Sequence, residues 1–214
     1  MMSPEAKQEI LAVLERTYRG TGTALKYSTP FEFLVAVILS AQCTDKRVNQ
    51  VTSRLFPAYN TSEKMLTLSQ EKLEDLIRDC GLFRTKARNI LAASEIILRD
   101  FGGRVPCRRE DLLRLPGVGH KTANVVLSQL CGIPALAVDT HVFRVARRLG
   151  LADGRTPDEV GAAIEQIVPR EKWGSAHHWL IWHGRLVCRA KKPPCETCPL
   201  GYLCPSRKGL AELE

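Results

Sequence analysis

The sequence predicts an all-α protein, and three observations support this fold class. Apolar residues recur at helical spacing through most of the 214 residues, as Ile10, Leu11, Val13 and Leu14 do near the N-terminus. Segments with the alternating apolar and polar residues of strands are nearly absent. Glycine or proline stands at the ends of most helical patterns. We therefore expect helices packed on helices.

Six helical patterns occupy the first half of the chain. The first, residues 3–18, is followed by Gly20 and Gly22, which end it. Residues 31–43 are too apolar for an ordinary surface helix, so this second helix should lie centrally, and Pro30 stands where a helix commonly begins. The remaining patterns cover residues 46–56, 69–79, 85–101 and 109–115.

Four more helical patterns follow in the second half. One begins at a capping box, in which the side chains of Thr156 and Glu159 each accept a hydrogen bond from the other's backbone amide. Pro157 takes the first helical position, and this helix should run to Val168. The other three cover residues 120–131, 140–149 and 173–187. No repeat, low-complexity segment or flexible linker interrupts the chain.

The composition is basic, with 31 Lys and Arg against 23 Asp and Glu and a formal net charge of +8. The pI near 9.2 favours a polyanionic partner such as nucleic acid, although a basic protein without such a partner has the same composition. The longest apolar run, Phe33 to Leu39, is too short to span a bilayer, and the N-terminus lacks the apolar core of an export signal. We expect a cytoplasmic monomer that does not bind membranes.

Cysteine spacing indicates a metal site near the C-terminus. Four of the eight cysteines are separated by six, two and five residues, and no export signal is present, so metal ligation is favoured over disulfides. Zinc usually prefers two short pairs, whereas only one pair is short here, so the spacing modestly favours iron-sulfur while zinc stays open. The metal-site cysteines are Cys188, Cys195, Cys198 and Cys204. The others, expected to be reduced and to fill small apolar sites, are Cys43, Cys80, Cys107 and Cys131.

The segment Pro116-Gly117-Val118-Gly119 joins two helical patterns. Its glycines allow a sharp turn that exposes backbone amides at the start of the second helix, where they can bind phosphate, although a turn without a ligand explains them equally well. Lys121 follows, as a nucleophilic amine or as a solvated surface charge. Asp139 precedes the helix at 140–149, and by itself is more simply an N-cap. A capping side chain is held rigidly, as a catalytic carboxylate must also be.

These motifs together resemble the endonuclease III family, within the helix-hairpin-helix, Gly-Pro-Asp superfamily of DNA glycosylases. The resemblance covers nearly the whole chain and implies a bifunctional DNA glycosylase and abasic-site lyase that excises oxidised pyrimidines from duplex DNA in base excision repair. It rests on Ser40-Ala41-Gln42, Gly81-Leu82-Phe83, Leu115 to Val126, Val138-Asp139-Thr140-His141 and Cys188 to Cys204, in the family's order.

The resemblance also implies a domain division and a partner. Residues 23–133 would form a helical barrel that contains the hairpin. Residues 1–22 and 134–214 would form a discontinuous iron-sulfur domain with one 4Fe-4S cluster on the four clustered cysteines. Duplex DNA with damaged bases or abasic sites would bind in the cleft between the two, and the protein would be bacterial in type and associated with the nucleoid.

Catalytic and lesion-binding roles follow from the same resemblance. Lys121 matches the nucleophile, which attacks the sugar, forms a Schiff base and allows β-elimination. Asp139 matches the carboxylate that assists this attack. Gln42 and Leu82 match residues that fill the gap left by the extruded nucleotide. The alternatives are an ordinary loop amide and a core leucine, and Leu82 is the better candidate because Gly81 permits a tight exposed turn. His141 matches a position lining the lesion pocket, and is otherwise structural.

The remaining expected DNA contacts lie in the hairpin and in the cysteine loop. In the hairpin they are Gly117, Gly119 and His120. Between the first two clustered cysteines, Arg189, Lys191 and Lys192 form a cationic loop that suits phosphate contacts, unless it is merely solvated. Two positions depart from the family pattern: close relatives often carry arginine at His120, and alanine or threonine at Cys43. Both departures leave lesion preference open.

Two other functions fit parts of the pattern. A monofunctional mismatch glycosylase would activate water with the aspartate alone, and Lys121 argues against it. A non-catalytic DNA-binding protein with a structural cluster would need neither Lys121 nor Asp139. A nicking assay on abasic DNA distinguishes this last alternative from the enzymes.

Overall fold

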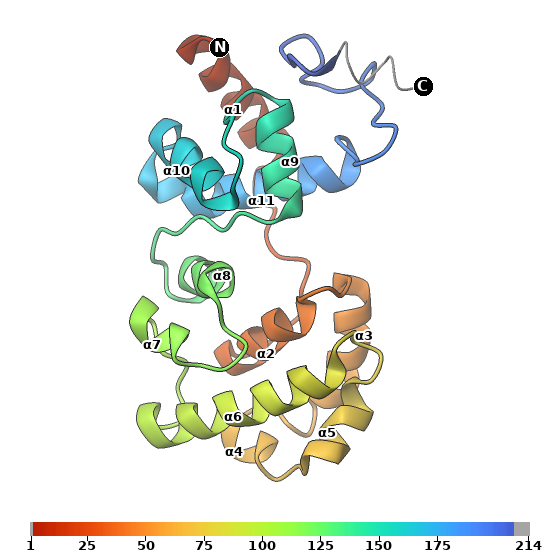
Figure 1. Cartoon of the computed structure of the whole chain (residues 1–214), viewed down its shortest axis with the longest axis vertical. Helices are drawn as coiled ribbons and strands as arrows, with labels where there is room; N and C mark the ends of the chain where they lie inside the picture. The colour runs from red at the N-terminus through yellow and green to blue at the C-terminus, as the bar shows by residue number, and fades with distance from the viewer. Residues whose placement is uncertain (1, 208–214) are drawn as a thin grey trace. The chain divides into compact units, whose positions relative to one another are not determined.

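The computed structural model describes residues 2–207, and every regular element in that range is a helix (Figure 1). The all-α prediction is therefore confirmed. None of the described helices combines the length and the apolar character that crossing a bilayer requires.

The chain divides into two compact units, of which one is discontinuous. The central unit runs from Ala24 to Gly132. The terminal unit combines the described residues up to Thr23 with those from Ile133 onward. The two ends of the chain therefore contribute to one unit, and the hairpin at residues 116–119 belongs to the other.

Helix α2 forms the core of the central unit. All residues from Phe31 to Leu39 are buried, which confirms the expectation of a central helix. Thr29 caps its start by accepting a hydrogen bond from the Glu32 amide. The helices of this unit are α2 (Pro30–Ser40), α3 (Asp45–Leu55), α4 (Ser62–Met65), α5 (Gln70–Ile77), α6 (Phe83–Phe101), α7 (Arg109–Leu113) and α8 (His120–Leu130).

Several helix boundaries differ from the expectation by one to three residues, and two of these differences occur beside left-handed residues. Helix α2 ends at Ser40 and not at Cys43, because Gln42 takes a left-handed backbone conformation that an α-helix does not accommodate. Helix α6 begins two residues early, directly after Leu82, which is also left-handed. Helix α4 was not expected, since its four residues are too few to show a helical period.

The terminal unit packs α1 and α9 against α11 (Figure 1). Its core contains apolar residues from all three helices, including Ile10 and Leu14 of α1 and Leu180 of α11. The predicted capping box is present, because Thr156 and Glu159 each accept a hydrogen bond from the other's backbone. The elements of this unit are α1 (Pro4–Tyr18), α9 (Thr140–Arg148), α10 (Pro157–Ile167), the 3-10 helix η1 (Arg170–Lys172) and α11 (Trp173–Leu186).

A disulfide joins Cys107 to Cys131, so the prediction that these two cysteines are reduced was wrong. Cys107 precedes α7 and Cys131 follows α8. Because these two helices pack against each other (Figure 1), the two Cα atoms lie 5.7 Å apart, within the range of disulfides. Cys43 and Cys80 are free, as expected, and Cys80 is fully buried.

Candidate functional site

The hairpin between α7 and α8 presents the start of α8 to solvent. Leu115 and Val118 are buried and hold the turn in place. Gly117 has a φ of +84°, and a Cβ there would lie 3.2 Å from the Asn89 side chain, so glycine is required. Gly119 is the N-cap of α8, has no side chain to cap the first amides, and has open space where a Cβ would be. These amides are therefore accessible to an anion such as a phosphate group.

Lys121 lies in the first turn of α8, next to His120, and both side chains are exposed. Within residues 2–207, no hydrogen bond or ion pair occupies the Lys121 amine. An exposed amine beside accessible helix amides can approach a sugar whose phosphate those amides bind. The predicted nucleophile is therefore sterically available on the surface of the central unit.

Asp139 is the N-cap of α9 in the terminal unit, as its place before a helix predicted. Its Oδ1 accepts a hydrogen bond of 2.7 Å from the Val142 amide. The preceding segment, Ala135 to Ala137, is buried, and the Asp139 side chain is only partly exposed. The carboxylate is consequently held in one orientation, while its second oxygen is not used by the cap.

Left-handed backbone marks three of the predicted DNA-contact residues. In the described range, the non-glycine residues with positive φ are Gln42 (52°), Leu82 (57°) and Lys192 (43°). Each such conformation costs about 1–2 kcal/mol outside glycine, and strained residues cluster at functional sites. Gln42 is exposed, and Leu82 is 59% exposed, so Leu82 is not a core residue.

The segments that carry Gln42 and Leu82 lie next to each other in the central unit. A Cβ added to Gly81 would lie 3.6 Å from the Gln42 carbonyl oxygen. Leu82 is the N-cap of α6 and makes no side-chain capping bond, so its side chain is free to project. We call residues 40–43 and 80–83 the two wedge loops.

The four clustered cysteines line one cavity in the terminal unit. Cys188, Cys195, Cys198 and Cys204 share it with Pro193, Pro194 and His183, and its lining among the described residues contains no acidic side chain. Within the described range, no group of three or more His, Cys, Asp or Glu side chains is arranged to hold a single metal ion. The four thiols thus line a common space.

A hydrogen-bonded path links α1 to this cavity. The Tyr18 hydroxyl lies 3.0 Å from His183 Nδ1, and His183 Nε2 lies 3.8 Å from Cys198 Sγ. Burial lowers the pKa of His183 to about 4, so the ring is neutral at physiological pH. A neutral ring that accepts from Tyr18 at Nδ1 carries its proton on Nε2, where it can donate to the Cys198 sulfur.

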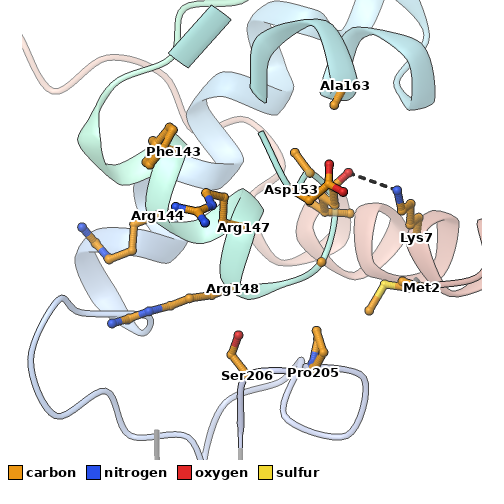
Figure 2. A pocket seen from close by; sticks show the side chains of 13 residues that line it. Met2, Lys7, Phe143, Arg144, Arg147, Arg148, Asp153, Ala163, Pro205 and Ser206 are labelled. Atoms are coloured by element: carbon orange, nitrogen blue, oxygen red, sulfur yellow. Dashed lines mark hydrogen bonds between the residues drawn. The ribbon is translucent and has the colours of Figure 1, made fainter. Parts of the chain in front are cut away.

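Two arginines of α9 hold the cysteine loop by its backbone. Arg148 donates to the carbonyl oxygens of Arg189 (2.7 Å) and Ala190 (3.0 Å), and Arg144 donates to that of Cys188 (3.1 Å). Figure 2 shows both guanidinium groups extending to the same side of α9. Neither arginine was predicted as a site residue, although their spacing of four residues on the helix after Asp139 is a usable signal.

His141 is half-buried beside Arg144. Its Nδ1 lies 3.2 Å from Arg144 Nη2, and Arg144 also donates to the Gly184 carbonyl oxygen. Burial lowers the pKa of His141, and the nearby Asp139 carboxylate only partly offsets this effect. A neutral His141 is therefore favoured, placed on the same helix that Asp139 caps.

The cysteine loop exposes its cations. Arg189, Lys191 and Lys192 are all exposed, and no ion pair within residues 2–207 involves them. A separate, larger cavity of the same unit is lined by Lys7 and by Arg147 of α9, with Asp153 as its one carboxylate (Figure 2). None of the predicted site residues lines this second cavity.

Comparison with known proteins gives consistent matches. A family model described as "HhH-GPD superfamily base excision DNA repair protein" matches residues 35–170. Endonuclease III of Rickettsia felis is 47% identical over 204 residues, which cover 95% of each chain. A solved non-covalent endonuclease III-DNA complex superposes with a TM-score of 0.95 at 42% identity, covering 99% of this chain and 100% of that one. A trapped endonuclease III-DNA covalent intermediate gives 0.93 at 43% identity, covering 98% and 99%.

Proposed function

The chain belongs to the endonuclease III family of the HhH-GPD superfamily of base excision DNA repair proteins, and from this we propose that it is a DNA glycosylase and abasic-site lyase. Its substrate would be duplex DNA that contains oxidised pyrimidines or abasic sites. The observation that carries the proposal is the position of Lys121, an accessible amine in the first turn of α8 beside uncapped amides that can bind a phosphate.

Lys121 would act as the nucleophile. Its amine, after losing a proton, forms a bond to C1′ of the damaged nucleotide as the C1′–N bond breaks and the base leaves with the electron pair. Opening of the sugar ring then gives an imine between Lys121 and C1′. Loss of a C2′ proton from this imine expels the 3′ phosphate, which cuts the strand by β-elimination.

Asp139 would assist the same step without forming a bond to the sugar. Its carboxylate can take the proton of the attacking amine and can stabilise positive charge on the sugar as the base departs. The cap on α9 supports this role, because it fixes the carboxylate and leaves one oxygen available. His141, neutral and half-buried on the same helix, would line the lesion pocket.

Gln42 and Leu82 would fill the space vacated by the extruded nucleotide. Extrusion costs a few kcal/mol of lost stacking and pairing, which inserted side chains partly replace. The left-handed conformations of both residues support this role, because they direct two exposed side chains outward from adjacent loops.

We further propose that the four clustered cysteines hold one 4Fe-4S cluster. The four cysteines share one cavity with no carboxylate of the described residues, and only one of their spacings is a short pair, so thiolate ligation of an iron-sulfur cluster is favoured over zinc. When bound, the cluster would crosslink the loop and so fix its backbone. Arg189, Lys191 and Lys192 would then contact DNA phosphates, with the Arg144 and Arg148 hydrogen bonds holding the loop against α9.

Borohydride trapping tests this proposal. Reduction of the imine leaves a permanent protein-DNA bond, so the parent should crosslink to a duplex with thymine glycol or an abasic site. Lys121→Gln should bind DNA without crosslinking, while Lys72→Gln, which alters another exposed lysine, should crosslink like the parent. Base release without trapping would instead indicate water attack, and DNA binding without nicking or base release would indicate a non-catalytic protein.

A further inference from the structure

Lys86 is a charged residue buried inside the central unit. It lies in the first turn of α6 and is 4% exposed, and its Nζ donates a hydrogen bond of 2.8 Å to the Leu39 carbonyl oxygen. Burial lowers the pKa of Lys86, while the neighbouring Cys80 and Cys43 thiols act in the opposite direction. Buried lysines are rare because desolvating an ammonium group is costly, so this one requires an explanation.

The side chain of Lys86 completes the end of α2. No basic residue of α2 itself stands in its last turn, where carbonyl groups lack helical partners and the helix dipole favours a cation. Lys86 supplies this cation from α6. Ser40 Oγ and the Cys43 amide satisfy two further carbonyls, those of Val37 and Ser40. The chain is thereby fixed on both sides of Gln42.

The backbone of the same residue bonds to the second wedge loop. The Lys86 amide donates to the Leu82 carbonyl oxygen at 3.0 Å, in the first hydrogen bond of α6. One residue therefore connects the segment that leads to Gln42 with the residue Leu82 itself. The close approach of Gly81 to the Gln42 carbonyl oxygen shows that the two loops also lie against each other.

We propose that Lys86 is a positioning residue that sets the two wedge loops relative to each other, so that Gln42 and Leu82 enter the same gap in a duplex. This inference rests on the proposed function, which assigns the insertion role to those two residues. Strained conformations persist only where surrounding contacts determine them. The Lys86 side chain bonds to Leu39, directly before the first wedge loop, and its amide bonds to Leu82 in the second. Being buried, Lys86 does not touch DNA.

The test compares Lys86→Met, which keeps the side-chain length and removes the ammonium, with Lys72→Met, which removes an exposed one. Extrusion is followed by the fluorescence of 2-aminopurine placed next to the lesion in a duplex. Lys86→Met should lose at least tenfold in the extrusion signal and in base release from duplex DNA. Its affinity for undamaged duplex should stay within twofold of the parent, and Lys72→Met should match the parent throughout.

A second substrate separates positioning from general misfolding. An abasic site in single-stranded DNA has no partner strand and needs no inserted side chain, so Lys86→Met should still form the Lys121 imine there, with trapping yields like those of the parent. Equal loss on single-stranded and duplex substrates would overturn the proposal. The fluorescence measurement requires binding but no chemistry, so it remains decisive even if the parent forms no imine and the proposed function fails.

Combination with Gln42→Ala/Leu82→Ala gives a further criterion. If Lys86 acts through the wedge loops, Lys86→Met should add less than twofold to the loss in base release caused by Gln42→Ala/Leu82→Ala, because both side chains that it positions are already absent. Additive losses would overturn the inference. Lys86→Gln, which keeps a neutral donor, provides a second variant, and if both variants fail to fold, Lys86 is assigned to stability alone and the proposal is wrong.

Discussion

The disulfide between Cys107 and Cys131 should account for much of the stability of the central unit. Replacing both cysteines with serine removes a crosslink between residues 24 positions apart. In the chain-entropy model, closing a loop of this length removes about 12 cal/mol/K from the unfolded chain, or about 3.5 kcal/mol at 25 °C. Because domains are stable by only about 5–15 kcal/mol, we expect the double variant to be strongly destabilised.

Urea unfolding followed by circular dichroism measures this effect. The oxidised parent should exceed both the reduced parent and Cys107→Ser/Cys131→Ser by about 3.5 kcal/mol in free energy of unfolding. Cys43→Ser serves as control, because this cysteine is free and only partly buried. In denatured, metal-free protein, thiol titration should find six free cysteines before reduction and eight after it. Eight thiols before reduction, or equal stability of the oxidised parent and the double variant, would refute the reasoning.

Three further predictions concern the proposed site. Asp139→Asn should retain the α9 cap and DNA binding yet lose at least about 100-fold in turnover, the lower end of the range for one acid-base group. Asp139→Ala should also lose about 1 kcal/mol of stability. Equal turnover of Asp139→Asn and the parent would exclude the catalytic role. Anaerobically purified protein should contain iron, which Cys195→Ser should diminish, and zinc without iron would contradict the cluster. In Lys191→Ala/Lys192→Ala, the slope of the logarithm of the binding constant against the logarithm of the salt concentration should become shallower by about 0.9 for each lost phosphate contact. The change should be equal for damaged and undamaged duplex. An unchanged slope would place the loop away from DNA.

Features set by neighbouring residues were predictable from the sequence. The capping box of Thr156 and Glu159 and the cap by Asp139 depend on positions three residues apart, so the local pattern sufficed. The burial of α2 followed from the unbroken apolar run from Phe33 to Leu39. In each case, the interaction that forms the structure lies within one turn of the residue that signals it.

Features that depend on distant packing were not predictable. Cys107 and Cys131 meet only because α7 folds against α8, and spacing alone gives no indication of this contact. The buried hydrogen bond from Lys86 to Leu39 joins residues that are 47 positions apart in the sequence. From the helical pattern alone, a lysine at position 86 would be expected on the solvent-exposed face. The left-handed conformation of Leu82 also runs against the preference of its residue type, so only the fold accounts for it.

The discontinuity of the terminal unit has a consequence for the order in which the protein is made. The central unit is complete in sequence once Gly132 has been synthesised, and it can fold while the rest is still being translated. Helix α1, made first, must wait for α11 before Ile10 and Leu14 are covered and Tyr18 reaches His183. The nascent chain therefore carries the uncovered apolar face of α1, a target for chaperones and proteases, until α11 has been made.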